Sequence, residues 1–295
     1  SAVWKYKMRT LQQLKDGALQ LQVNFTLEEG TESSAAAAVN FNFSNWSTDN
    51  YVLIPGVVYN GNRFPVLKGG YMPPYPASMY FNKDLPLTFS DNPRLALHKN
   101  ESSKIELLTW STSTPAMSFF SKAQQQGFIV LSEPKTKLGV SGLMVEENDD
   151  RSKASFSVTA PGVREYVAGF GDFSKSHDKA HHWKKGDELT IRLYVYAFPA
   201  ENIPAFLETW MNKRKALLGE TPQYYVAPMN TIFEYTKLQV EKNRFYNSPF
   251  ASIYFPENSF TRFQLGWIGG LMNTYPMLGL NDSLHLKRVA NTFDF

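Results

Sequence analysis

Apolar and polar residues alternate through the first two thirds of the chain, from about Gly17 to Phe198. In residues 18–27 every second residue is apolar, and residues 188–198 repeat the pattern through Leu189, Ile191, Leu193, Val195 and Ala197. A period of two is typical of strands that bury one face. Similar runs predict strands at residues 38–43, 51–59, 104–110, 116–120, 127–132, 138–146 and 154–159. With turn residues between them, they predict a large antiparallel two-sheet β-sandwich.

Two long stretches interrupt the strand pattern. Residues 60–86 contain five prolines and three glycines, and residues 171–186 are polar and contain three histidines. Neither stretch predicts a strand. A loop as long as the first is unusual inside a compact domain and is more often functional than idle.

After Phe198 the apolar period changes from two residues to that of a helix. Asn202 is a helix N-cap residue, Pro204 suits the first turn, and Gly219 suits the C-terminal end. The apolar stripe between them consists of Ile203, Phe206, Leu207, Trp210, Met211, Leu217 and Leu218. We therefore predict a β-supersandwich at residues 1–199, a linker helix within 200–222 and a helical part at 223–295.

The helical part is expected to contain a helix at about 231–246 and then a helical hairpin in residues 263–295. The last helix carries one apolar stripe, formed by Leu286, Val289, Ala290 and Phe293. No capping Gly, Asn or Pro follows it. An apolar stripe needs a packing partner, so we expect further helices and predict that this chain is the front part of a longer, truncated α/α toroid.

Composition narrows the class of protein only modestly. The 295-residue chain has 30 basic and 27 acidic residues, a balance that argues against nucleic acid as a partner. It has no cysteine, which excludes a disulfide framework and thiolate chemistry and fits both periplasm and cytoplasm. Aromatic residues reach 15%, as in clefts that stack sugar rings, although a large β-sandwich core also consumes aromatics. No apolar run is long enough to span a membrane.

Several segments resemble proteins of one superfamily. Residues 51–64, 141–148, 160–165 and 265–276 are similar to segments of Bacteroidetes-type members of the six-hairpin glycosidase superfamily. That superfamily joins an N-terminal β-supersandwich through a linker helix to an (α/α)6 toroid, the layout predicted above. The resemblance implies a carbohydrate substrate, no cofactor, and a periplasmic or secreted location, with cytoplasm as the alternative. It assigns no catalytic residue, because the family's carboxylates lie on toroid loops that this chain mostly lacks.

Two groups of residues are candidates for contact with a sugar. In the first, amide, guanidinium and aromatic groups follow a strand closely, and a guanidinium fork suits a uronate carboxylate; its members are Asn62, Arg63, Tyr71 and Tyr75. The alternative is a structural turn in which Arg63 binds a backbone carbonyl. The second group is Trp267, Asn273 and Tyr275, near glycines that let a ligand approach. Its alternative is tight helix–helix packing.

Two further clusters are interpreted as structural. The first contains His177, Asp178, His181 and His182, but the lysine-rich segment lacks helical periodicity, so a solvated loop is expected and no metal is assigned. The second begins at Glu146 and Glu147, which point to opposite faces if they lie on a strand. An acidic turn is therefore expected there rather than a pair of catalytic carboxylates.

The sequence thus predicts the N-terminal portion of a carbohydrate-active enzyme, similar to glycoside hydrolases and inactive as a fragment. A non-catalytic carbohydrate-binding or structural module is one alternative, with binding dependent on Tyr71, Tyr75 or Trp110. A polysaccharide lyase is the other.

Overall fold

The computed structural model describes residues 2–14, 17–66, 90–169, 172–219, 227–246, 253–255 and 270–294. The chain forms two compact units, Ser1–Gly219 and Glu220–Phe295. The first unit consists mainly of β-strands, and the second contains most of the helices. The prediction of a mainly β protein with a C-terminal helical part is therefore confirmed. Each unit is treated by itself below.

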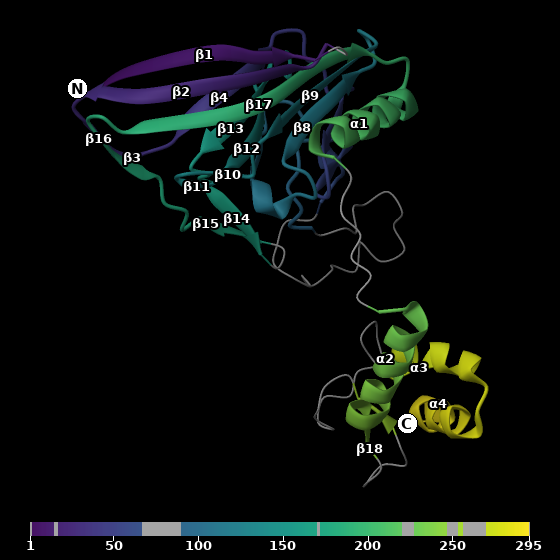
Figure 1. Cartoon of the computed structure of the whole chain (residues 1–295). Helices are drawn as coiled ribbons and strands as arrows, with labels where there is room; N and C mark the ends of the chain where they lie inside the picture. The colour runs from purple at the N-terminus through teal and green to yellow at the C-terminus, as the bar shows by residue number, and fades with distance from the viewer. Residues whose placement is uncertain are drawn as a thin grey trace. The chain divides into compact units, whose positions relative to one another are not determined.

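A seven-stranded antiparallel sheet forms one layer of the first unit (Figure 1). Its strands, in spatial order, are β1 (Val3–Gln13), β2 (Leu19–Glu29), β17 (Glu188–Pro199), β9 (Gln126–Ser132), β8 (Ala116–Ser121), β5 (Tyr51–Ile54) and β6 (Val58–Tyr59). The alternation predicted in residues 188–198 is present, because Leu189, Ile191 and Leu193 all belong to the core between the sheets.

A four-stranded antiparallel sheet packs against the first. Its order is β4 (Ala37–Phe43), β13 (Ala154–Ala160), β12 (Gly142–Glu147) and β7 (Ser103–Leu108). Side chains from both sheets form one buried cluster, with Val130 and Met117 from the larger sheet and Leu143, Val145 and Phe156 from the smaller. The two sheets therefore make a sandwich, as the pattern of alternation predicted.

Aromatic rings fill the centre of this sandwich. Edge-on and tilted contacts connect five of them at centroid distances from 4.8 to 6.4 Å; these rings are Phe43, Trp46, Phe119, Phe128 and Phe156. Ring edges against ring faces are the favoured geometry for such pairs. Part of the high aromatic content is therefore used by the core, as the structural alternative proposed.

Helix α1 (Ile203–Leu218) covers the outer face of the larger sheet (Figure 1). Its N-terminus is capped as predicted, since the Asn202 side chain accepts a hydrogen bond from the Ala205 backbone N–H, and Gly219 ends it. Phe206 and Trp210 pack into a second core with residues of β8, β9 and β17. The helix predicted as a linker is thus an integral layer of the first unit.

Shorter elements complete the first unit. Pairs of strands form outside the two main sheets: β3 (Thr31–Ala35) with β16 (His181–Lys184), β10 (Lys135–Thr136) with β11 (Gly139–Val140), and β14 (Tyr166–Gly169) with β15 (Asp172–Lys175). Two 3-10 turns lie at η1 (Asn60–Asn62) and η3 (Thr109–Ser111).

Three sequence expectations need correction here. Strand β1 lies before Gly17 and was not predicted. The stretch 171–186 contains β15 and β16 rather than only loop, because both strands pair with partners that its polar sequence does not reveal. The run 138–146 divides into β11 and β12, since Ser141 is bonded across to the turn after β7 instead of continuing a strand.

The second unit contains α2 (Met229–Arg244), the strand pair β18 (Phe245–Tyr246) and β19 (Ile253–Tyr254), α3 (Gly270–Thr274), the 3-10 helix η4 (Tyr275–Leu280) and α4 (Ser283–Asp294). Helix α2 agrees with the predicted helix at about 231–246, and α4 with the last helix of the predicted hairpin. The buried face of α4 differs from the predicted stripe, however: the buried residues are His285, Val289 and Thr292.

Polar contacts explain the change of face on α4. The Thr292 hydroxyl accepts a hydrogen bond from the Tyr254 backbone N–H, and the imidazole of His285 lies within 2.8 Å of carboxylates of Asp282 and Glu241. These contacts bring both polar side chains inward. Leu286 and Phe293 remain exposed among the described residues.

Candidate functional site

A groove of about 990 Å³ runs along β7 in the first unit. One side is formed by β7 itself, including Lys104 and Glu106, and the opposite side by residues 93–98. The segment 164–167 and Phe173 close one end, and Val57 and Ser111 lie along its border. This groove combines apolar walls with charged side chains, so it is the candidate site.

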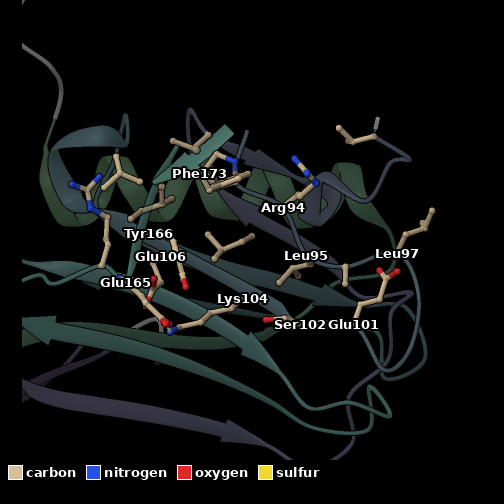
Figure 2. Close-up of a pocket in the computed structure, with 18 of the residues that line it drawn as sticks. Arg94, Leu95, Leu97, Glu101, Ser102, Lys104, Glu106, Glu165, Tyr166 and Phe173 are labelled. Atoms are coloured by element: carbon tan, nitrogen blue, oxygen red, sulfur yellow. Dashed lines mark hydrogen bonds and ion pairs between the residues drawn. The ribbon is translucent and has the colours of Figure 1, made fainter. Parts of the chain in front are cut away.

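Three charged side chains gather at one end of the groove (Figure 2). The Lys104 ammonium lies 2.7 Å from a Glu106 carboxylate oxygen and 3.5 Å from one of Glu165. The Glu165 backbone N–H donates to the second Glu106 oxygen at 2.8 Å. Burial acts to lower the pKa of Lys104, but the hydrogen bond and charge of Glu106 and the charge of Glu165 outweigh it, so this pKa is raised.

A second ion pair fixes the segment that carries Glu165. Arg164 binds Asp178 through Nε at 2.8 Å and a terminal nitrogen at 3.0 Å, a bidentate geometry, and its backbone N–H donates to the same carboxylate. The hydrogen bonds from Arg164 hold the pKa of Asp178 below its usual value, while burial acts in the opposite direction. Asp178, a candidate of the histidine cluster, therefore anchors the groove.

The Arg164–Asp178 pair should make stability depend on pH at the acid end. Because the folded-state pKa of Asp178 is lowered, its contribution is complete above the unfolded value of about 3.9 and is lost as pH falls through the folded value. We expect Asp178→Asn to be less stable than wild type at pH 7, with the difference shrinking below about pH 4. Urea unfolding of both proteins from pH 7 to pH 2.5 measures this difference. A pH-independent gap would contradict the assignment.

Two aromatic rings stand at the rim of the groove. Tyr166 and Phe173 are 46% and 42% exposed. They lie on the same face of the β14–β15 pair, because Tyr166 is opposite Lys175 and Phe173 opposite Ala168. The Arg94 guanidinium lies 5.9 Å from the Phe173 ring centre, and burial lowers the pKa of Arg94. Figure 2 shows Phe173 near Arg94 and Tyr166 near Glu106 and Glu165.

A buried carboxylate supports the opposite wall. The Glu147 side chain is fully buried and pairs with Arg63 and, at 3.7 Å, with Arg151. It also accepts hydrogen bonds from the Trp46 indole at 2.5 Å and the Ser103 hydroxyl at 2.6 Å. Four side chains from separate parts of the chain thus converge on one carboxylate.

The two arginines of this Glu147 cluster hold the wall of the groove through backbone carbonyls. Arg63 donates to the Ala96 carbonyl at 2.6 Å. Arg151 donates to the carbonyls of His98 and Glu101 at 2.7 and 2.6 Å. The position of residues 93–101 therefore depends on the buried carboxylate of Glu147, which holds the two arginines.

The structure gives the predicted sugar-binding residues Asn62 and Arg63 structural contacts. The Asn62 amide donates to the carbonyls of Val57 and Pro93, at 2.9 and 2.8 Å, and its oxygen accepts from the Tyr59 backbone N–H. The Arg63 side chain is only 8% exposed. Both residues thus correspond to the alternative of a structural turn, and neither presents its polar group to the groove.

The other predicted contact residues lie outside the described residues or in the second unit. Tyr71, Tyr75 and Trp267 lie outside the described residues. Asn273 and Tyr275 are exposed in the second unit, at the end of α3 and the start of η4. They remain candidates without a described cavity around them.

His181 and His182 lie on β16 rather than in the expected solvated loop, whereas the acidic segment after β12 forms a turn, as predicted. Among the described residues, no group of His, Asp and Glu has an arrangement that could hold a metal ion. Glu146 is exposed and Glu147 buried, so the two do point to opposite faces, and Asp150 binds Asn148 and Ser152 in the acidic turn. In the described part of the chain, every helix is too short or too polar to cross a membrane.

The sequence analysis missed the main residues of the groove. Lys104 and Glu106 belong to a predicted strand, and their alternation with Ile105 was interpreted only as strand pattern. A signal was present, because opposite charges two residues apart on a strand share one face. Tyr166 and Phe173 left no comparable signal, since their pairing depends on the β14–β15 register.

Comparisons with known proteins leave the family open. Neither the protein-family models nor the curated proteins give a match to this sequence. Among solved structures, a TPR-domain containing protein from Parabacteroides distasonis matches with 8% identity and a TM-score of 0.40, covering 86% of this chain and 41% of its own. A protein from Escherichia coli K12, provisionally assigned as an aldose 1-epimerase, matches with 9% identity and a TM-score of 0.34, covering 67% of this chain and 68% of its own. The chain therefore spans less than half the length of the first of these proteins.

Proposed function

We propose that this chain is the N-terminal part of a carbohydrate-active protein and that its β-unit binds a poly- or oligosaccharide in the groove along β7. The observation that carries this proposal is the exposure of Tyr166 and Phe173 on one face at the rim, beside the Lys104–Glu106–Glu165 charges. A sugar ring stacks its C–H face on aromatic rings, while its hydroxyls need donors and acceptors close by. The groove offers both.

The groove suits binding better than cleavage. A glycosidase needs one carboxylic acid kept protonated and a second carboxylate across the scissile bond. In this groove the Glu106 carboxylate is bound to the Lys104 ammonium. Next to the groove, hydrogen bonds from Arg164 lower the pKa of Asp178, which favours its charged form, and a charged carboxylate cannot donate a proton. We assign glycosidic-bond cleavage instead to an α/α toroid, of which the second unit would be the opening part and further helices the remainder.

Exposed aromatic residues near the groove extend the proposed binding surface. Trp110, on η3 next to Ser111 of the groove border, is 73% exposed. Its turn is held against the turn after β5, because the Ser113 backbone N–H donates to the Pro55 carbonyl at 2.9 Å. An exposed indole on a turn whose neighbouring backbone is held in place is a good platform for a further sugar ring.

Removing the two rim rings tests the proposal. We expect Tyr166→Ala/Phe173→Ala to weaken oligosaccharide binding at least tenfold, equivalent to about 1.4 kcal/mol, because both stacking surfaces are lost. Calorimetric titration with neutral and uronate-containing oligosaccharides measures the affinity. Tyr6→Ala is the matched control, since Tyr6 is an exposed ring of the same unit away from the groove.

Two outcomes of the titration would contradict the proposal. One is binding that is unchanged in the double variant, and the other is equal weakening by Tyr6→Ala. The same samples should release no reducing ends from polysaccharide. Turnover by this chain would overturn the assignment of catalysis to further helices, and ultraviolet-absorbing unsaturated products would identify that turnover as a lyase reaction.

A further inference from the structure

Strand β1 forms an edge of the larger sheet. It pairs with β2 through ten register pairs and, among the described residues, with no other strand. Along an edge, alternate backbone N–H and C=O groups point away from the sheet, and a further strand can bind them. With 11 residues, β1 is long for an edge strand, because proteins usually keep such edges short.

One face of β1 is apolar and exposed. Trp4 packs edge-on against Trp183 at 4.9 Å and joins the core. Tyr6 and Met8 lie on the same face, opposite Phe25 and Val23 of β2, yet they are 75% and 64% exposed. They extend the apolar face of the sandwich beyond the part that the smaller sheet covers.

The other face of β1 is basic. Lys5, Lys7 and Arg9 occupy alternate positions, so all three side chains project from this face. Lys5 is bound to Glu28 at 2.8 Å. The strands beside it contribute mainly neutral polar residues opposite Lys7 and Arg9, namely Asn24 and Gln22 of β2. The strand edge therefore combines an apolar side with a cationic side.

We propose that the edge of β1 binds an extended, acidic segment of a partner protein as an additional strand. In such a segment Asp or Glu would alternate with apolar residues. The acidic side chains would lie beside Lys7 and Arg9, and the apolar ones beside Tyr6 and Met8, because paired strands place neighbouring side chains on the same face. This inference is independent of the proposed sugar binding, which takes place at β7.

The chemistry of β1 disfavours two other occupants. A second copy of the chain paired antiparallel about Met8, the centre of β1, would place Lys7 opposite Arg9, and like charges directly opposite each other are destabilising. A polyanion such as an acidic polysaccharide lying along Lys7 and Arg9 would not reach Tyr6 and Met8, which project from the other face of the strand. Only an alternating acidic and apolar strand uses both faces.

A charge swap tests the proposal. The probe is a synthetic nine-residue peptide in which Glu alternates with Val and Tyr, titrated into the whole chain. We expect Lys7→Glu/Arg9→Glu to weaken its binding at least tenfold, and the same peptide with Lys in place of Glu to bind this variant instead. Lys99→Glu/Lys122→Glu, which changes two exposed lysines elsewhere, is the matched charge control. Equal thermal midpoints of the variants verify that they fold.

Hydrogen exchange on the same complex reports where the peptide binds. Bound peptide should slow amide exchange in β1, and Tyr6→Asp/Met8→Asp should weaken binding with the basic face intact. An affinity unaffected by the charge swap would overturn the proposal. So would heparin fragments that bind as tightly as the peptide and are insensitive to Tyr6→Asp/Met8→Asp, since the surface would then be a simple anion patch.

Discussion

Replacing Glu147 by alanine is expected to lower the free energy of unfolding of the first unit by about 3–5 kcal/mol, the usual cost of removing one partner from a buried ion pair. Two arginines, Arg63 and Arg151, would be left inside the protein without their carboxylate. The Trp46 indole and the Ser103 hydroxyl would also lose an acceptor. Urea unfolding followed by tryptophan fluorescence measures the change.

The neighbouring residue provides the control for this prediction. Glu146 lies on the same strand, carries the same charge and is exposed. Glu146→Ala should change stability by no more than about 0.5 kcal/mol. Equal losses in the two variants would mean that Glu147 contributes no more than a surface charge. Hydrogen exchange should also show residues 93–101 opening first in Glu147→Ala, because their carbonyls are held by Arg63 and Arg151.

Phe206→Ala is expected to lower the free energy of unfolding of the first unit by about 3–5 kcal/mol, as truncation of other buried phenylalanines does. The ring is fully buried and stacks parallel to Phe198 at a centroid distance of 5.9 Å. It also lies close to Gly127, where an added Cβ would be 2.8 Å from it. Because the surrounding atoms are closely packed, removing the ring would leave a cavity, and the cavity lowers the stability.

The Phe206→Ala variant tests whether α1 stabilises the β-unit or only connects the two units. Met211→Ala is the control, because Met211 lies on the same helix and is exposed; its effect should stay within about 0.5 kcal/mol. If α1 only connected the two units, Phe206→Ala would leave the unfolding midpoint of the β-unit unchanged. Urea unfolding followed by circular dichroism at β-sheet wavelengths distinguishes the two results.

Much of the fold could be predicted because its signals are local. The period-two runs that became β9, β13 and β17, and the capped helix α1, depend on residues adjacent in the chain. Strand β1 carries the same alternation through Trp4, Tyr6 and Met8, although it was not predicted.

The candidate site was less predictable because it depends on contacts between distant residues. Arg63 and Glu147 are 84 residues apart, so nothing near either one indicates that they pair. Asn62 and Arg63 were predicted to bind a sugar because of their amide and guanidinium groups, and the same groups are suited to binding backbone carbonyls. On α4, helical periodicity identified Val289 correctly but could not show that His285 and Thr292 find polar partners inside.

The position of β17 has a consequence for the order in which the sheet can assemble. Among the described residues, the β1–β2 hairpin joins the rest of the larger sheet only through β17, which pairs with β2 on one side and β9 on the other. Strand β17 follows β2 by more than 150 residues of chain, and the bond between Thr190 and Asn24 spans this separation. During synthesis the hairpin therefore cannot pair with β17, and keeps one apolar face uncovered, until residues 188–199 have left the ribosome. Such long-range closure makes folding slow and exposes the early strands to aggregation.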